Sequence, residues 1–106
     1  RRYFLYCLFI HPTPMSLPDV ADQLTVWSGD ESGDSYLRQR LYLYNELYHD
    51  HLPSLREADI VEYDQRADMV WLGLEADAVR PVVGRYLLQD YTELVQAEKQ
   101  SSDIDG

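Results

Sequence analysis

Apolar positions recur at helical spacing along most of the chain, so the hydrophobic pattern predicts a mostly helical protein. Residues 3–10 form an apolar and aromatic run that is too short to distinguish a helix from a strand. Beyond a proline-rich break, Ser16, Pro18 and Asp19 predict a helix start, because a serine cap, an early proline and an acid at the third position are typical there. Residues 28–34 have the composition of a loop.

The longest helical pattern of the first half covers residues 35–58. Its apolar positions return on one helical face and are Leu37, Leu41, Tyr44 and Tyr48. Pro53 interrupts the pattern and predicts a kink or two abutting helices. Residues 60–63 and 69–72 are β-prone, and the polar residues between them predict a hairpin turn.

A second long helical pattern follows the hairpin and carries an apolar stripe. The stripe includes Val79, Val83, Tyr86, Leu87, Tyr91 and Leu94. On a single chain this stripe would be exposed, which soluble proteins avoid. We therefore expect the C-terminal helices of two chains to pair about a two-fold axis, with these six residues as the dimer interface.

The predicted order is helix, helix, helix, hairpin and long helix. A helix pair joined by a loop, followed by a helix that runs directly into a hairpin, is the winged helix-turn-helix plan. The expected fold class is therefore α+β, mostly helical. We expect a winged helix-turn-helix DNA-binding domain in residues 1–75, a dimerisation helix in residues 76–100 and a polar tail in residues 101–106.

The charge composition indicates an unusual solvent. The chain of 106 residues has 12 Asp and 7 Glu but 8 Arg and a single Lys, for a net charge of −10. A generic acidic protein or a disordered acidic tail is the alternative, but the acids are spread over a chain of ordinary hydrophobic content. We interpret the composition as an adaptation to molar salt, where screening falls to about 3 Å and hydrated cations associate with the acidic surface. At molar salt, a negative net charge is therefore only weak evidence against a nucleic-acid partner.

Several classes of function find no support in the sequence. No apolar run approaches the roughly 20 residues of a membrane span. Cys7 is the only cysteine and lies in an apolar stretch, so we expect a core residue rather than a redox sensor. The histidines have no metal-ligand spacing, and no phosphate-binding or nucleophile motif occurs. We expect a cytoplasmic protein that is not an enzyme and has no cofactor, metal or membrane partner.

Three segments resemble a known family. They are RRYFLYCL (residues 1–8), SLPDVADQLTVW (residues 16–27) and RQRLYLYNELYHDHLPSLREADIVEYD (residues 38–64). The chain resembles, over roughly residues 1–72, small haloarchaeal winged-helix proteins, and the last segment is similar to the end of the recognition helix in PadR- and MarR-like regulators. The resemblance implies a dimeric transcription regulator that binds double-stranded DNA, with a role in stress response. Asp59 stands where the family pattern has glycine, and aspartate tolerates the left-handed conformation.

Four polar positions of the third helix lie within about 40° of one another around its axis. They are Arg38, Tyr42, Asn45 and His49. Each can address DNA, since arginine bonds to guanine or phosphate, asparagine to adenine, and tyrosine and histidine to phosphate or a thymine edge. The alternative is an ordinary solvated face. Within the winged-helix order we favour DNA contact.

Three further arginines have distinct expected roles. Arg66 at the hairpin tip is a candidate for the minor groove, or else an exposed turn residue. Arg2 could touch phosphate from the first helix, or belong to a partly ordered terminus. Arg40 points nearer the apolar side and is expected to pair with a carboxylate.

The sequence therefore predicts a sequence-specific transcription regulator that acts as a homodimer. The alternative is a winged-helix module that binds proteins and never touches DNA. Such a module would prefer aromatic and aliphatic residues on the outer face of the third helix.

Overall fold

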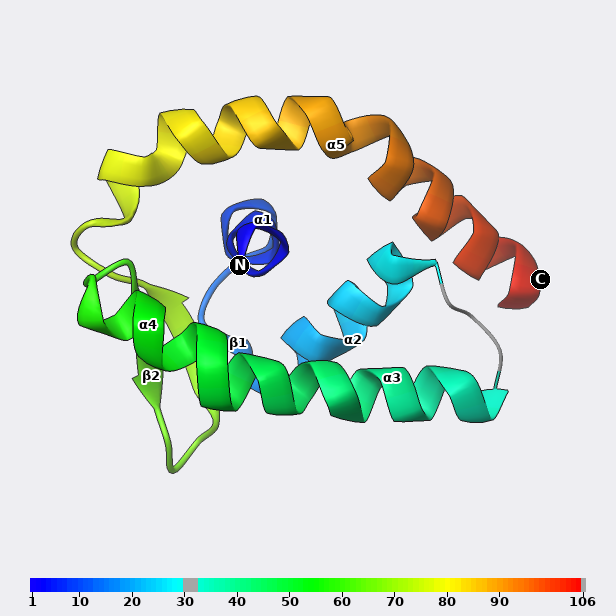
Figure 1. Cartoon of the computed structure of the whole chain (residues 1–106), viewed down its shortest axis with the longest axis horizontal. Coiled ribbons are helices and arrows are strands. Elements are labelled where there is room, and N and C mark those ends of the chain that lie inside the picture. The colour runs from blue at the N-terminus through cyan, green and yellow to red at the C-terminus, as the bar shows by residue number, and fades with distance from the viewer. Residues whose placement is uncertain (30–32, 106) are drawn as a thin grey trace.

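The computed structural model describes the backbone of residues 1–29 and 33–105 and the side chains of residues 1–29 and 35–100. The elements are α1 (Arg2–Ile10), β1 (Met15–Ser16), α2 (Leu17–Ser28), α3 (Gly33–Glu46), the π-helical turn η1 (Leu47–His51), α4 (Leu52–Glu57), β2 (Val61–Asp64), β3 (Met69–Leu72) and α5 (Ala76–Asp105) (Figure 1). The mostly helical α+β class is confirmed. Helix α5 continues through most of the expected polar tail. No helix in the described part of the chain combines the length and apolar content that crossing a membrane requires.

The predicted hairpin is confirmed and gains a third strand. Strands β2 and β3 pair antiparallel with Val61 opposite Leu72, and the sheet order is β1-β3-β2. Strand β1 was not expected, because two residues are too short to show a period. Asp59 adopts the expected left-handed conformation with φ 60°. Gly73 is required beside it, since an added Cβ would lie 2.4 Å from the Asp59 carbonyl oxygen.

Local chemistry explains the helix boundaries. The Ser16 side chain accepts a hydrogen bond from the Asp19 amide at 3.1 Å, which confirms the expected cap of α2. The predicted break at Pro53 takes the form of the π-helical turn η1 just before it. Proline has no amide hydrogen and its ring crowds the carbonyl four residues earlier, so the chain widens there instead of continuing as a regular α-helix.

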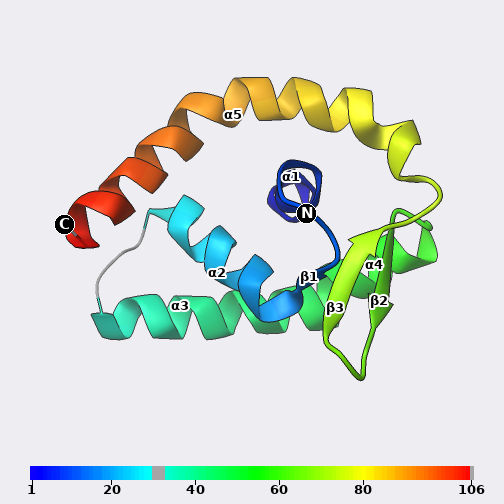
Figure 2. The ribbon, with the colours of Figure 1, turned by 180° about the vertical axis from the view of Figure 1, so that it is seen from behind.

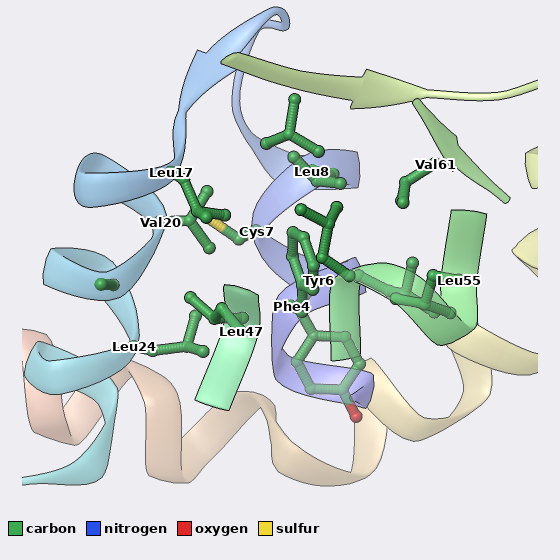
Figure 3. Packing of buried hydrophobic residues seen from close by; sticks show 14 of the residues in the cluster. Phe4, Tyr6, Cys7, Leu8, Leu17, Val20, Leu24, Leu47, Leu55 and Val61 are labelled. Carbon is green, nitrogen blue, oxygen red and sulfur yellow. The ribbon is translucent and has the colours of Figure 1, made fainter. Parts of the chain in front are cut away.

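Helix α1 lies at the centre of the molecule and is seen end-on between α5 and the other helices (Figure 1). Five consecutive residues of α1 are buried: Phe4, Leu5, Tyr6, Cys7 and Leu8. In Figure 3 several of these side chains meet residues from α2, α4, η1 and β2. A helix that is buried on all sides has no polar face, so this run lacked a period as well as the length that would distinguish a helix from a strand.

The apolar face predicted for residues 35–58 is buried only in part, since Tyr44 and Tyr48 pack against the core and the two leucines of this face do not. Leu37 and Leu41 are each 62% exposed, whereas Leu47 in η1 is 1% exposed and Leu43 packs against the core. Packing against α2 decides this rotation, and the ion pair of Arg40 with Asp22 at 3.5 Å lies on the packed side. The predicted pairing of Arg40 with a carboxylate is confirmed.

Helix α5 packs on its own chain, which corrects part of the expected dimer interface. Val83 is 6% exposed and Leu94 4% exposed, and both belong to the core of the single chain. Val79 and Leu87 pack against that core. The premise that these four side chains are exposed on a single chain is therefore wrong, because α5 folds back over α1 and α2 (Figure 2). The dimer itself stays a prediction.

Two carboxylates fasten α5 to the helices beneath it. Asp90 accepts a hydrogen bond from the Tyr6 hydroxyl at 2.7 Å and pairs with the Arg2 guanidinium at 3.1 Å. Glu98 accepts hydrogen bonds from the Trp27 indole at 2.9 Å and from a side-chain amide of α2 at 3.3 Å. These contacts fix the rotation of α5 about its axis, and therefore which residues it exposes.

Replacing a core leucine of α5 should destabilise the protein. We expect Leu94→Ala to lower the free energy of unfolding by about 2–5 kcal/mol, because it leaves a cavity between α5 and the core. Leu74→Ala is the control, since Leu74 is 91% exposed. Thermal unfolding in molar KCl measures both. Equal effects of the two substitutions would show that α5 does not pack on its own chain.

Candidate nucleic-acid interface

An open groove of about 370 Å³ separates the C-terminal part of α3 and η1 from the hairpin. The lining residues are Tyr44, Asn45, Tyr48, His49, Tyr63, Gln65 and Asp68. These side chains are aromatic or polar, and they come from α3, η1 and the hairpin, which projects beside α3 (Figure 1). The groove therefore lies between α3 and the hairpin, both of which carry predicted candidates for DNA contact.

Asp68 holds the two walls of the groove together. Its carboxylate accepts hydrogen bonds from the hydroxyl of Tyr44 in α3 at 2.7 Å and from that of Tyr63 in β2 at 2.5 Å. Its backbone carbonyl accepts from the Leu17 amide at the start of α2 at 2.9 Å. Asp68 has φ 55°, a conformation that aspartate tolerates better than most residues. One residue thus fixes the position of the hairpin relative to α2 and α3.

The electrostatics of this contact keep both tyrosines neutral. Burial, and then the hydrogen bond to Asp68, raise the pKa of Tyr44 to about 12. The same causes raise the pKa of Tyr63 further above its usual value. A phenolate beside the Asp68 carboxylate would place two negative charges in contact, so the folded protein favours the protonated phenols.

Tyr48 completes an aromatic wall. Its ring stacks on Tyr44 with centroids 6.3 Å apart and meets the ring of Tyr63 edge-on at 6.2 Å. It also meets His49 edge-on at 5.0 Å. The Gln65 side chain donates a hydrogen bond to the Tyr48 hydroxyl at 3.1 Å. Two polar groups that line the groove are therefore held by Tyr48: the imidazole of His49 by a ring contact and the amide of Gln65 by a hydrogen bond.

The four residues predicted on the outer face of α3 and η1 are all exposed, as expected. They are Arg38, Tyr42, Asn45 and His49. Asn45 and His49 line the groove, whereas Arg38 and Tyr42 continue the same side of α3 away from the hairpin. The Tyr42 hydroxyl donates to the Glu46 carboxylate at 2.9 Å, which orients this phenol along the helix.

Arg66 is exposed at the tip of the hairpin, as predicted. The turn that presents it is built by Asp64, whose Oδ1 accepts hydrogen bonds from the amides of Arg66 at 3.0 Å and Ala67 at 3.4 Å. This side-chain contact with the backbone replaces the Asn-Gly turn that the sequence lacks. The hairpin tip, which carries Arg66, extends past α3 on the side of the molecule opposite α5 (Figure 1).

Arg2 does not join this surface. Its guanidinium pairs with Asp90 of α5 and lies over the rings of Tyr3 and Tyr86 at 5.8 and 5.5 Å. It therefore helps to anchor α5, on the edge of the molecule away from the hairpin. The expected phosphate contact of Arg2 has no support in this geometry.

The sequence did not predict the hydrogen bonds of Asp68 or the aromatic wall around Tyr48. Tyr44 and Tyr48 were assigned to a plain apolar face, although a tyrosine there also carries a hydroxyl that needs a partner. The available signal for a polar contact here was the tight turn after Tyr63, which contains both Asp64 and Asp68. It could not show that the tyrosines of α3 would meet Asp68, because that contact depends on how the hairpin docks.

Other polar and titratable groups lie elsewhere. A second cavity of about 220 Å³ lies behind α3, against α1 and α2, with Glu46 and His51 among apolar side chains. Burial lowers the pKa of His51, and its Nδ1 atom has no hydrogen-bond partner. Cys7 is fully buried, and burial raises the pKa of its thiol to about 12. The residues that the structure describes hold no group of three or more acids, histidines or cysteines suited to a metal ion.

Removing the charge of Asp68 should change the alkaline titration of the protein. Stability that depends on neutral Tyr44 is complete below its unfolded pKa near 10 and is lost as the pH rises toward about 12. In Asp68→Asn we expect tyrosines to ionise at lower pH, as followed by the ultraviolet absorbance of tyrosinate. Asp77→Asn, in an exposed ion pair of α5, should leave the titration unchanged. Identical curves for Asp68→Asn and the wild type would contradict the assigned contact.

Comparison with known proteins identifies a family. Residues 1–71 match a family described as a domain of unknown function, DUF7344. The matched part contains α1 to β3 apart from the last residue of β3, and α5 lies beyond it. No curated protein and no solved structure matches the chain. Because the match extends over more than half of the chain, the protein belongs to the DUF7344 family.

Proposed function

We propose that this protein is a winged-helix transcription regulator that binds double-stranded DNA as a homodimer at molar salt. The element order, with one short strand before α2 and the strand order β1-β3-β2, supports the winged-helix assignment. The resemblance of three segments to haloarchaeal winged-helix regulators supports it as well. The observation that carries the proposal is the continuous exposed surface of α3, η1 and the hairpin, held together by Asp68.

The geometry suggests a division of tasks on the duplex. Helix α3 would enter the major groove, where Arg38 and Asn45 have the donors and acceptors that read guanine and adenine edges. The hairpin would follow the sugar-phosphate backbone and bring Arg66 to the adjacent minor groove. Gln65 and His49, which are held by Tyr48, face the space between these two contacts and are suited to phosphate oxygens.

A protein-interaction module is the second candidate, and one observation favours it. Leu37 and Leu41 are each 62% exposed on α3, and Tyr42 is 57% exposed. Such residues are typical of a surface that binds a protein. On DNA the same leucines would have a narrower use, against the methyl groups of thymine. The two candidate functions therefore differ in which side chains of α3 bind the partner. A DNA-binding protein would use the polar residues Arg38 and Asn45, whereas a protein-interaction module would use the leucines.

Substitutions on α3 and at the hairpin tip should have different effects on DNA binding. We expect Asn45→Ala to cost about 1–3 kcal/mol at one base position and to relax the preference there. Arg66→Ala should weaken binding to most sequences alike, since a backbone or minor-groove contact carries little base information. Selection from a random duplex pool, followed by fluorescence anisotropy, measures both effects. Gln96→Ala, exposed on α5, is the control. Unchanged affinity and preference in both variants would favour the protein-interaction module.

DNA affinity should depend weakly on salt, because exposed carboxylates approach phosphate. Four acids lie in or just before α3 along the chain: Asp30, Glu31, Asp34 and Glu46. Asp30 and Glu31 lie outside the described residues, as does the side chain of Asp34. Glu46 lines the cavity behind α3. Asp50, whose side chain is 65% exposed next to His49, is the better candidate. Cations taken up between such acids and the duplex oppose the release of counterions from DNA.

We therefore expect a shallow or positive slope of log affinity against log KCl concentration, measured from low to molar salt with circular dichroism at each point. Asp50→Asn should make the slope more negative, whereas Glu93→Gln on α5 should not. A steep negative slope in folded wild-type protein would exclude the proposed uptake of cations.

A further inference from the structure

Two leucines of α3 are exposed although they lie on the apolar face of this helix. Leu37 and Leu41 are each 62% exposed, whereas Tyr44 and Tyr48 on the same face pack against the core. The difference follows the position of the hairpin, which lies beside the C-terminal end of α3 while the N-terminal half extends beyond it (Figure 1). Removal of apolar surface from water is favourable, so these leucines favour an occupant that has apolar groups of its own.

The two leucines continue the groove that α3 forms with the hairpin. Each residue advances a helix by about 100°, which places Leu41 about 60° from Tyr44 and about 40° from Asn45 around the axis. Tyr44 and Asn45 both line the groove. Leu37 follows Leu41 one turn toward the N-terminus of α3. The face of the helix that lines the groove therefore extends beyond the hairpin to both leucines.

The neighbours of the leucines point to a duplex as the occupant. Arg38 and Asn45 lie within about 60° of Leu41 around the helix, and their side chains have the donors and acceptors that read base edges. A recognition helix contacts base edges with its N-terminal residues, and both leucines belong to the N-terminal part of α3. The apolar group that a base pair presents in the major groove is the C5-methyl of thymine.

The charge of the chain favours an uncharged contact of this kind. The protein has 9 basic residues against 19 acids, and at molar salt the attraction between an arginine and a phosphate is strongly screened. Contact between a leucine and a methyl group involves no charge, so screening does not weaken it. An apolar contact therefore contributes both affinity and base information under the conditions that the composition indicates.

We propose that Leu37 and Leu41 contact the C5-methyl groups of thymines in the major groove. The protein then prefers half-sites that carry thymine beside the bases read by Arg38 and Asn45. This inference rests on the DNA binding of the proposed function and specifies which bases the apolar part of α3 selects.

Uracil tests the contact directly, because it differs from thymine only by the missing C5-methyl group. The probe is the duplex selected from a random pool, and a second copy carries deoxyuridine at every thymine position. Fluorescence anisotropy in molar KCl measures both affinities. We expect the wild type to bind the uracil duplex about fourfold more weakly for each methyl group that contacts a leucine.

Leucine variants assign the methyl contact to α3. Leu37→Ala and Leu41→Ala should each weaken binding to the thymine duplex and bring the ratio of the two affinities closer to one. Leu88→Ala is the matched control, since Leu88 is 79% exposed on α5, and it should keep the affinities of the wild type. Circular dichroism and thermal unfolding verify the fold of each variant. The thymine-to-uracil ratio of the wild type should stay constant from low to molar KCl, because the methyl group is uncharged.

Three results would overturn the proposal. Equal affinities for the two duplexes, in folded wild-type protein that binds DNA, would overturn the thymine contact and leave the regulator proposal standing. A wild-type ratio in both leucine variants would assign the methyl contact to other residues. Folded wild-type protein that selects no duplex would overturn both proposals, and the leucines would then belong to a surface that binds a protein.

Discussion

The carboxylate of Asp68 is the contact on which the candidate interface depends. It accepts hydrogen bonds from one tyrosine of α3 and one of β2, while its backbone carbonyl holds the start of α2. A hydrogen bond to a charged acceptor contributes about 1.5–3 kcal/mol, less where water reaches it. Two such bonds are enough to bias a short hairpin toward one orientation, because the strands themselves have only four residues each. The outer face of α3 and the hairpin tip can then act as one rigid surface.

The rest of the molecule separates two surfaces at opposite edges. Helix α1 fills the centre, and α5 closes over it through a buried face and the two carboxylates Asp90 and Glu98. These polar contacts set the rotation of α5, so that Leu88 and Tyr91 remain outside. Helix α5 is thus left with exposed apolar residues, and the opposite edge with polar and aromatic groups. In a protein of net charge −10, local placement of a few arginines matters more for a polyanionic partner than the overall charge.

Features decided by near neighbours in the chain were predictable from the sequence, and features decided by docking were not. The cap at Ser16 and the break at Pro53 depend on backbone chemistry within one turn, and both were predicted. The exposure of Leu37 was missed, because the side of α3 that faces α2 is set by packing between distant segments. For the same reason the sequence showed an apolar stripe on α5 but not that Val83 belongs to the core of its own chain. The role of Asp68 needed the hairpin in place, since its partner in α3 is 24 residues away.

Amide chemical-shift mapping of the isotope-labelled protein in molar KCl, with the duplex that it prefers, tests the central claim most directly. If the surface held by Asp68 binds DNA, the largest shifts fall on the amides of Arg38, Asn45, His49, Gln65 and Arg66. The amides of Leu88 and Tyr91, which are exposed on α5, stay unchanged. Shifts confined to other parts of the chain, or none at all in folded protein with any duplex, would contradict the assignment of this surface to DNA.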